Sequence, residues 1–268
     1  MKLLLYPNGI GGGQRISHFR QILNFEWTLD PSDPDITHAI YHDKKNRKEY
    51  PDVLREVEKR GITVWNKDIV SIKKSYVFDM FLKVFGYDIR IDPTKHRGVA
   101  LKRTEQNAIH NAKFIECPIP EWQVDTTPRV SGQGEPHYRQ YVRMIDTRVS
   151  RDKIRDYRLS VIKRKPYLLF EKLIDSRCMF HVPPDVYFEV RPMRGLHPVF
   201  FPDEIEKIEQ FIEEMKLDYG EIDLLRNNST GLIYIVDVND IPAGALANHI
   251  PRDLLIEWAN EFKRLMLC

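Results

Sequence analysis

The chain has 268 residues, of which 42% are hydrophobic and 30% are charged, a composition typical of a folded globular protein. Its 41 Lys and Arg residues nearly balance its 39 Asp and Glu residues, so the formal net charge is only +2. A general nucleic-acid-binding protein carries a strong basic excess, and this balance argues against that class. No segment approaches the roughly 18 apolar residues that a membrane span needs, so no membrane partner is expected.

The three cysteines are widely spaced, at Cys117, Cys178 and Cys268. They suggest neither a disulfide framework nor a CxxC metal site, so we expect a reducing, cytoplasmic location. Among His96, His110, His137, His181, His197 and His249, no two have the spacing of a zinc site, so zinc is not expected.

The N-terminal third alternates between short apolar runs and amphipathic segments. Strands are predicted at 3–6, 37–41 and 62–65, and helices at 15–23, 52–60 and 75–85. This alternation is typical of a small parallel α/β unit. A glycine-rich turn, Gly9 to Gly13, falls between the first strand and the first helix, where an anion-binding loop would lie. Because it lacks the P-loop ending, a purely conformational turn is the favoured interpretation, and a co-substrate site stays open.

Strands dominate after Asp92 and Pro93. They are predicted at 99–102, 114–117, 138–145, 156–162 and 167–173, with a polar loop over 104–113. The segment 125–136 is rich in Thr, Pro, Ser and Gly, which predicts a mobile loop. An amphipathic helix begins at Pro202, a hairpin pairs 220–226 with 232–238, and a last helix covers 252–267.

The hairpin carries acidic residues inside apolar strands. Because side chains alternate along a strand, Asp237 and Asn239 point to the same side. If Arg226 pairs with Leu232, Asp223 joins that side as a diagonal neighbour of Asp237, roughly 7–8 Å away. The opposite, core-facing side would hold Ile222, Leu224, Tyr234, Val236 and Val238.

Two carboxylates and an amide oxygen at one end of this hairpin suit Mg²⁺ shared with substrate phosphates. The alternative is an ordinary exposed hairpin whose acids contact water or a lysine. Burial of unpaired carboxylates is costly, and the strands around Asp223 and Asp237 are strongly apolar, so we favour a metal site.

The segments 217–223 and 234–244 resemble the metal-binding hairpin of ATP-grasp enzymes, a superfamily that includes glutathione synthetase and D-alanine–D-alanine ligase. Its members carry an acid on one strand, then an acid–apolar–Asn triplet and a Pro-Gly turn. The resemblance implies that Asp223, Asp237 and Asn239 hold one or two Mg²⁺ ions on the phosphates of ATP. It also implies an α/β (α+β) ATP-grasp fold with an N-terminal α/β domain (1–95), a nucleotide-covering subdomain (96–145) and a C-terminal subdomain (146–268).

The same resemblance suggests where the nucleotide and the catalytic cations lie. Lys74 and Lys102 are similar in place to the family's phosphate-binding lysines, and 140–142 resembles the strand that reads adenine, with Gln140, Tyr141 and Val142. The segment 156–161 resembles the family's Asp-x-Arg strand, and the residues expected to supply catalytic positive charge are Arg158, Lys172 and Arg177. One departure is the covering loop, since 104–112 has no glycine-rich sequence.

The function implied by the resemblance is an ATP- and Mg²⁺-dependent carbon–nitrogen ligase. A carboxylate of a small molecule, peptide or sugar would be activated as an acyl phosphate and attacked by an amine. A phosphotransferase on the same fold and a nucleotide-binding module without turnover are the alternatives. A glycosyltransferase would not account for the acidic hairpin. Members of the family are often dimers, so a homodimer is also an expectation.

Overall fold

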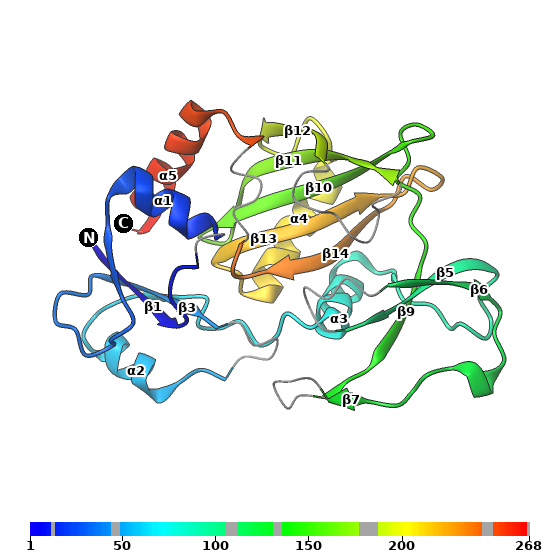
Figure 1. Ribbon diagram of the computed structural model, residues 1–268, viewed down its shortest axis with the longest axis horizontal. Helices are drawn as coiled ribbons and strands as arrows, with labels where there is room; N and C mark the ends of the chain where they lie inside the picture. Colours follow the sequence, from blue (N-terminus) through cyan, green and yellow to red (C-terminus); the bar gives the residue numbers. More distant parts are fainter. Residues whose placement is uncertain are drawn as a thin grey trace.

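The computed structural model describes residues 1–11, 14–43, 49–105, 112–130, 136–176, 187–242 and 249–266. These residues form four β-sheets and five α-helices, the mixed α/β class that the sequence predicts (Figure 1). None of the helices in these ranges is long and apolar enough to cross a membrane.

The N-terminal unit is a parallel sheet in the order β2-β1-β3-β4. Its strands are β1 (Lys2–Pro7), β2 (Glu26–Thr28), β3 (His38–His42) and β4 (Val64–Trp65), and its helices are α1 (Arg15–Leu23) and α2 (Asp52–Lys59). Alternation along β1 buries Leu4 with Leu54 of α2, and Leu3 and Leu5 with Phe19 of α1. The sequence analysis missed β2, which is only three residues long.

A second, antiparallel sheet lies at the other end of the molecule, in the order β6-β5-β9 (Figure 1). Its strands are β5 (Gly98–Thr104), β6 (Lys113–Cys117) and β9 (Arg139–Arg143), and we call it the covering sheet. The short helix η1 (Glu121–Gln123) precedes the segment 125–136, which was predicted as a mobile loop. This segment includes β7 (Arg129–Val130) and the first residue of β8 (Pro136–His137), and the two short strands pair with each other. Residues 131–135 and 106–111 lie outside the described residues.

The largest sheet has five antiparallel strands in the order β12-β11-β10-β13-β14. These are β10 (Lys153–Ile162), β11 (Lys165–Asp175), β12 (Tyr187–Arg194), β13 (Tyr219–Arg226) and β14 (Ile233–Asn239). One face packs in a single hydrophobic cluster with α3 (Lys74–Phe85) and α4 (Pro202–Met215). The sequence analysis did not predict β12.

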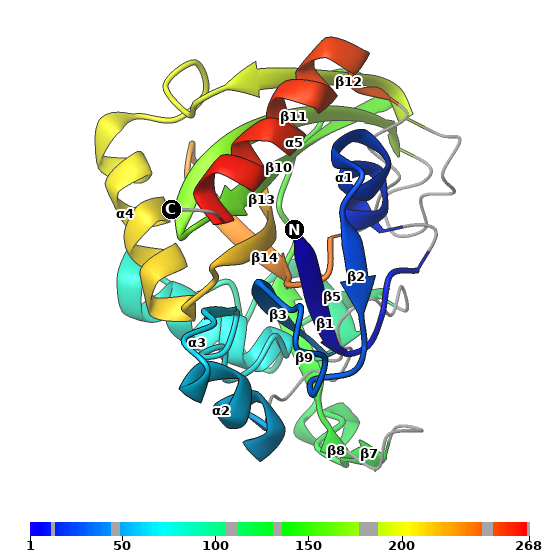
Figure 2. The same cartoon turned by 90° about the vertical axis from the view of Figure 1, so that its left-hand side faces the viewer.

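The other face of this sheet has an apolar end and a charged end. At the apolar end, Phe170 and Tyr219 pack beneath α1 and α5 (Arg252–Met266), against Phe19, Trp258 and Phe262 (Figure 2). The helices therefore cover only part of this face. The charged end holds the acids of the hairpin.

The register of the hairpin differs from the prediction. Arg226 pairs with Ile233 instead of Leu232, because the turn closes through a hydrogen bond from the Asn227 N–H to the Leu232 carbonyl oxygen. A β-bulge then lies between the pairs Asp223↔Asp237 and Leu224↔Ile235. The two acids are therefore directly opposite each other, and the predicted diagonal arrangement is wrong.

The bulge also changes which residues of β14 face the core. Ile235, opposite Leu224, joins the buried face, whereas Tyr234 pairs with Leu225 on the other side. Val236 lines a cavity on that same side. Tyr234 is nevertheless 1% exposed and lies in the same hydrophobic cluster as Phe81 of α3, and the partly buried Val236 packs against that cluster. The prediction that both are core residues is therefore confirmed, although strand pairing places Tyr234 on the side of Leu225.

Asn66 joins the N-terminal unit to the five-stranded sheet. Its side chain is buried, its Nδ2 donates to the Tyr219 carbonyl oxygen (2.8 Å), and its Oδ1 accepts from the Tyr219 N–H (2.9 Å). The backbone N–H of Asn66 also donates to Asp218 Oδ2 at 2.7 Å. One amide side chain thus satisfies both backbone groups of a buried strand residue.

We predict that Asn66→Ala lowers the free energy of unfolding by about 2–4 kcal/mol, since it leaves two buried backbone groups without partners. Denaturant unfolding measures this value. Asn66→Asp keeps the acceptor but places a buried carboxylate oxygen against the Tyr219 carbonyl oxygen, so it should cost at least as much as Asn66→Ala. Equal stability of Asn66→Ala and the native chain would contradict the assigned role.

Candidate active site

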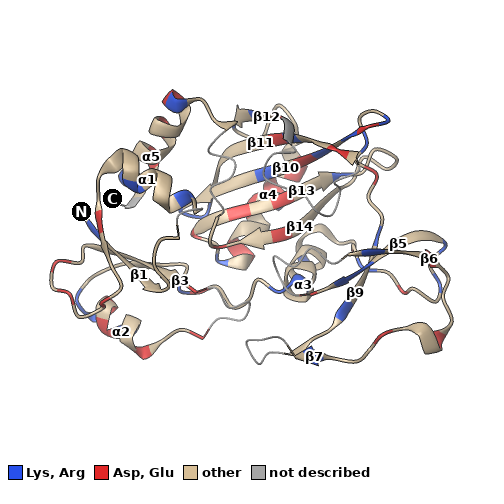
Figure 3. Cartoon of the chain, in the orientation of Figure 1, with Lys and Arg blue, Asp and Glu red and all other residues tan. Residues whose placement is uncertain are grey.

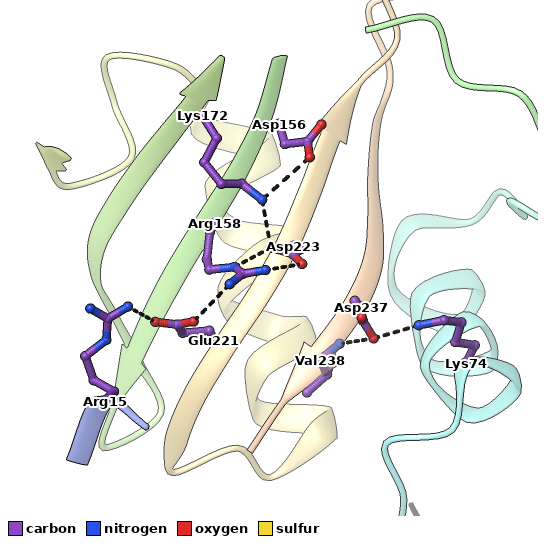
Figure 4. A network of polar contacts seen from close by, with 9 residues as sticks. All are labelled: Arg15, Lys74, Asp156, Arg158, Lys172, Glu221, Asp223, Asp237 and Val238. Carbon is purple, nitrogen blue, oxygen red and sulfur yellow. Dashed lines mark hydrogen bonds and ion pairs between the residues drawn. The ribbon is translucent and has the colours of Figure 1, made fainter. Parts of the chain in front are cut away.

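Charged residues gather at one end of the five-stranded sheet (Figures 3 and 4). Strand pairing places them on one face, because Asp156 lies opposite Lys172, Arg158 opposite Asp223, Glu221 opposite Asn239, and Asp223 opposite Asp237. This face is next to the apolar end that α1 and α5 cover. The sequence therefore places seven hydrogen-bonding side chains on one surface of four neighbouring strands.

Arg158 and Asp223 form a two-point ion pair at the centre of this face. Arg158 Nε donates to Asp223 Oδ1 at 2.7 Å, and Arg158 Nη2 donates to Asp223 Oδ2 at 2.8 Å. Lys172 Nζ lies 3.6 Å from Asp223 Oδ1. Burial favours the neutral carboxyl group, but the two cations outweigh it and hold the pKa of Asp223 well below its usual range.

Asp156 lies at the edge of the same network. Its Oδ2 is 3.5 Å from the buried Lys172 Nζ. Burial raises the pKa of the Asp156 carboxyl group, and the positive charge of Lys172 only partly offsets this effect. Lys172 therefore interacts with two carboxylates at once.

Asp237 is paired with Lys74 from a different part of the chain. Lys74 is the first residue of α3, is 1% exposed, and lies with its Nζ 2.9 Å from Asp237 Oδ1. Burial lowers the pKa of Lys74, and Asp237 opposes that shift. The Val238 N–H also donates to Asp237 Oδ1 at 3.1 Å. Burial likewise lowers the pKa of Arg103 on β5, and the charge of Asp237 acts in the opposite sense.

Glu105 fixes the start of α3 against the covering sheet. Its carbonyl oxygen accepts from the Lys74 N–H at 2.8 Å, and its carboxylate accepts from the Ser75 hydroxyl group and from the Tyr138 N–H. Glu105 is itself buried. These contacts hold Lys74 where it reaches Asp237.

A cavity of about 160 Å³ lies between the covering sheet and the charged face. Leu101 and Val142 form part of its wall on the covering sheet, and Ile154, Leu225 and Val236 do so on the larger sheet. The polar lining residues include Arg103, Arg143, Thr147, Asp156 and Asp223. The cavity is therefore apolar on its sides and charged where it meets the ion-pair network.

The structure brings most of the predicted site residues together. Asp223, Asp237, Arg158, Lys172 and Lys74 meet in the contacts described above. Asn239 lies on the same face, opposite Glu221. Arg177 lies outside the described residues, as do Gly12 and Gly13 of the glycine-rich turn.

Lys102 is not brought to the cavity. Its Nζ pairs with Asp125 at 3.1 Å and lies 5.8 Å from the ring centroid of Tyr141. Alternation along β5 instead sends Leu101 and Arg103 to the cavity. The sequence analysis did not select Arg103, because the face of β5 that meets the larger sheet is set by tertiary packing and not by a local pattern.

The strand of residues 140–142 contributes to the cavity through one residue. Val142 lines it, whereas the Tyr141 hydroxyl oxygen accepts from the Asp125 N–H at 2.8 Å on the other side of the sheet. Gln140 lies opposite Arg103. The segment that follows, 143–145, also lines the cavity.

The donor set suits a metal ion that is shared with a substrate. Among the residues that the structure describes, no group of three or more His, Cys, Asp or Glu side chains is arranged to hold a metal ion. Asp223, Asp237 and Asn239 offer two carboxylates and one amide oxygen. Mg²⁺ commonly takes one or two protein carboxylates and completes its shell with phosphates and water, so these residues fit Mg²⁺ on a nucleotide.

Comparison with known proteins connects this arrangement to a structural class. Searches found no family model that matches the chain. They found no curated protein with a matching sequence. Similar solved structures include the ATP-grasp ligase PsnB complexed with minimal precursor, Mg and ADP, with a TM-score of 0.60 and 9% identity over 100% of this chain and 98% of that chain.

Two further structures agree with this match. One is a RiPP-associated ATP-grasp ligase from Chryseobacterium gregarium in complex with ADP and a leader and core peptide (TM-score 0.51, 14% identity, 98% of this chain and 96% of that chain). The other is D-alanine–D-alanine ligase from Bacillus anthracis complexed with ATP (TM-score 0.51, 11% identity, 98% of each chain). The chain therefore has the ATP-grasp fold, and the resemblance of its hairpin is confirmed at the level of fold.

We predict that Asp223→Asn lowers the free energy of unfolding at pH 7 by about 3–5 kcal/mol, because Arg158 and Lys172 lose a buried counter-charge. The pKa of Asp223 is lowered in the folded state. Its stabilising contribution is therefore complete above the unfolded pKa of about 3.9 and decreases as the pH falls below that value. Denaturant unfolding at neutral and acidic pH measures the difference.

The exposed Glu206 on α4 offers a matched control, since Glu206→Gln removes one carboxylate without touching the network. A difference between Asp223→Asn and the native chain that stayed constant down to pH 3 would contradict the ion-pair account.

Proposed function

We propose that the chain is an ATP- and Mg²⁺-dependent ligase that activates a carboxylate as an acyl phosphate for attack by an amine. The observation that carries the proposal is an apolar cavity beside a face of paired acids and cations, within the ATP-grasp fold. Because one fold supports many activities, the proposal rests on the residues of the site.

The cavity would bind the adenine base. Its volume of about 160 Å³ is below the roughly 300–1,000 Å³ of pockets that enclose a whole ligand. The apolar side chains of Leu101, Val142 and Ile154 would contact the faces of a base. The phosphates would then lie outside the cavity, over the charged face.

Two cationic side chains lie where those phosphates would bind. Arg103 of β5 borders the cavity, and Lys74 of α3 forms an ion pair with Asp237 of β14. Both are largely withdrawn from solvent, and burial disfavours their charged forms, so a polyphosphate would be a strong electrostatic partner for each. Arg103 thus takes the place in this proposal that the sequence analysis gave to Lys102.

Asp237, Asn239 and Asp223 would hold Mg²⁺. When bound, the ion would neutralise negative charge on the phosphates as a Lewis acid. Each of the two acids is already paired with a cation. We therefore expect the site to bind Mg²⁺ together with a nucleotide much better than Mg²⁺ alone, because the phosphates provide new partners for the displaced cations.

The reaction would proceed in two steps. A carboxylate oxygen of the substrate attacks the γ-phosphorus, the bond to the bridging oxygen breaks, and ADP leaves. The amine nitrogen then attacks the acyl carbon, phosphate leaves, and the amine gives up a proton. Arg158 and Lys172 lie beside the acidic residues and would stabilise the charge that develops on the transferred phosphoryl group.

The substrate class favoured here is a peptide that bears the reacting carboxylate or amine. PsnB and the Chryseobacterium gregarium ligase were both solved in complexes with precursor or core peptides. The peptide is proposed because the chain shares its fold with these ligases at 9–14% identity. The homodimer and the cytoplasmic location stay as predictions.

The direct test traps the acyl phosphate with hydroxylamine, which replaces the unknown amine. The chain is incubated with Mg²⁺, ATP and pools of peptides that carry Asp, Glu or C-terminal carboxylates. We predict ADP, phosphate and a hydroxamate in equal amounts, with hydroxamate formation at least about 100-fold slower in Asp237→Asn because charge stabilisation at the phosphates is lost.

The exposed Asp253 provides a matched control, and Asp253→Asn should react at the native rate. ADP formation with a phosphorylated product and no hydroxamate would instead indicate a phosphotransferase. Bound nucleotide without any ADP formation would indicate a module without turnover. Either result would contradict the ligase proposal.

A further inference from the structure

A buried ion pair lies next to the candidate metal ligands, and the sequence analysis did not single it out. Arg15 Nη2 donates to Glu221 Oε1 at 2.9 Å, and the side chains are 0% and 1% exposed. The pair as a whole is more deeply buried than the Lys74–Asp237 pair and than the Lys172 pairs with Asp156 and Asp223. It connects α1 of the N-terminal unit to β13 (Figure 4).

Arg15 is held in place on several sides. Its backbone N–H donates to the Pro242 carbonyl oxygen at 2.9 Å, just beyond the end of β14. Its Cζ lies 4.4 Å from the ring centroid of Trp258 on α5. Arg15 is therefore a rigid anchor for Glu221.

Stability alone does not explain this pair. Removing two charges from water costs about as much as their attraction returns, so apolar residues of the same size are often equally stable or better. The atoms not used in the pair add to the cost, because Arg15 Nε and Nη1 and Glu221 Oε2 are buried and form no hydrogen bond within the described residues.

The geometry around Glu221 Oε2 suggests a role other than stability. Arg158 Nη1 lies 3.7 Å from this oxygen, beyond hydrogen-bond distance. The other two nitrogens of the same guanidinium group are bound to Asp223. The Glu221 carboxylate is therefore a second possible partner for Arg158. It lies close to the guanidinium group but is too far away for a hydrogen bond.

We propose that Glu221, anchored by Arg15, is a positioning residue that accepts Arg158 when a metal ion takes Asp223. The inference rests on the proposed function, in which Asp223 is a metal ligand. Arg158 donates to both oxygens of Asp223, so a metal ion that binds Asp223 competes with Arg158 for these oxygens and weakens the two-point ion pair. Glu221 Oε2 keeps the displaced guanidinium group paired in a largely buried site, where an unpaired charge would be costly.

The shift that this requires is small. Nη1 must approach Glu221 Oε2 by about 0.8–1.0 Å, from 3.7 Å to the 2.7–2.9 Å typical of a charge-assisted hydrogen bond. Glu221 cannot follow Arg158 toward Asp223, because Arg15 holds its other oxygen. The anchor therefore sets the direction in which Arg158 moves.

The test is a Mg²⁺ titration of the melting temperature at a fixed, saturating concentration of ATP, with the full chain. Glu221→Gln alone would leave Arg15 unpaired and could unfold the protein, so the main variant is Arg15→Met together with Glu221→Met, which removes both charges at similar volume. We expect this double variant to fold. Its half-maximal Mg²⁺ concentration should rise about 10- to 100-fold, the equivalent of one lost charge-assisted hydrogen bond.

A second comparison separates positioning from a general structural effect. If Glu221 acts through Arg158, the same double substitution made in an Arg158→Met background should change the Mg²⁺ midpoint by no more than about twofold. A loose or damaged site would instead raise the midpoint equally in both backgrounds, and that result would overturn the inference.

The outcomes also distinguish this inference from the proposed function. If the native chain shows no Mg²⁺-dependent stabilisation with ATP, the proposed function fails and the inference fails with it. If the native chain responds and the Arg15→Met/Glu221→Met variant has the same midpoint, the inference alone is overturned. A raised midpoint that depends on Arg158 supports it.

Discussion

Buried carboxylates on the five-stranded sheet are paired with guanidinium and ammonium groups. The need to pair these carboxylates determines where α1 and α3 lie against the sheet. Unpaired charges at these positions would be too costly to bury, so every acid needs a cation from another segment. Arg158 and Lys172 come from neighbouring strands. Lys74 comes from α3 and Arg15 from α1, so the network joins three parts of the chain.

In the proposed function, this pairing would prepare the face for an anionic ligand. The acids and cations neutralise one another in the free protein, and a bound metal–polyphosphate would exchange partners with both. The apolar cavity next to the network would fix the base, while the cations would remain beside the phosphates. Nucleotide binding and stabilisation of the phosphate charge would then take place on one surface. The hairpin acids, α3 and the covering sheet would act together for this reason.

Much of this arrangement could be predicted from local pattern. Alternation along the strands placed Asp237 and Asn239 together, and periodicity located α1, α3 and α4 to within about a residue. The bulge beside Asp237 has no clear local signal, so the register was missed. Lys102 was preferred over Arg103 because the face of β5 that meets the larger sheet depends on tertiary packing. The Arg15–Glu221 pair spans 206 residues, and no local pattern predicts it.

The central claim is that this face binds Mg²⁺ and ATP through the paired acids. A crystal structure with Mg²⁺ and a hydrolysis-resistant ATP analogue tests it most directly. The account predicts a base between Leu101 and Ile154, and phosphates beside Lys74 and Arg103. It also predicts metal held by Asp237 and Asn239, with Asp223 partly released from Arg158. A nucleotide bound elsewhere, or one bound here while Arg158 still occupies both oxygens of Asp223 and the metal contacts none of these residues, would contradict it.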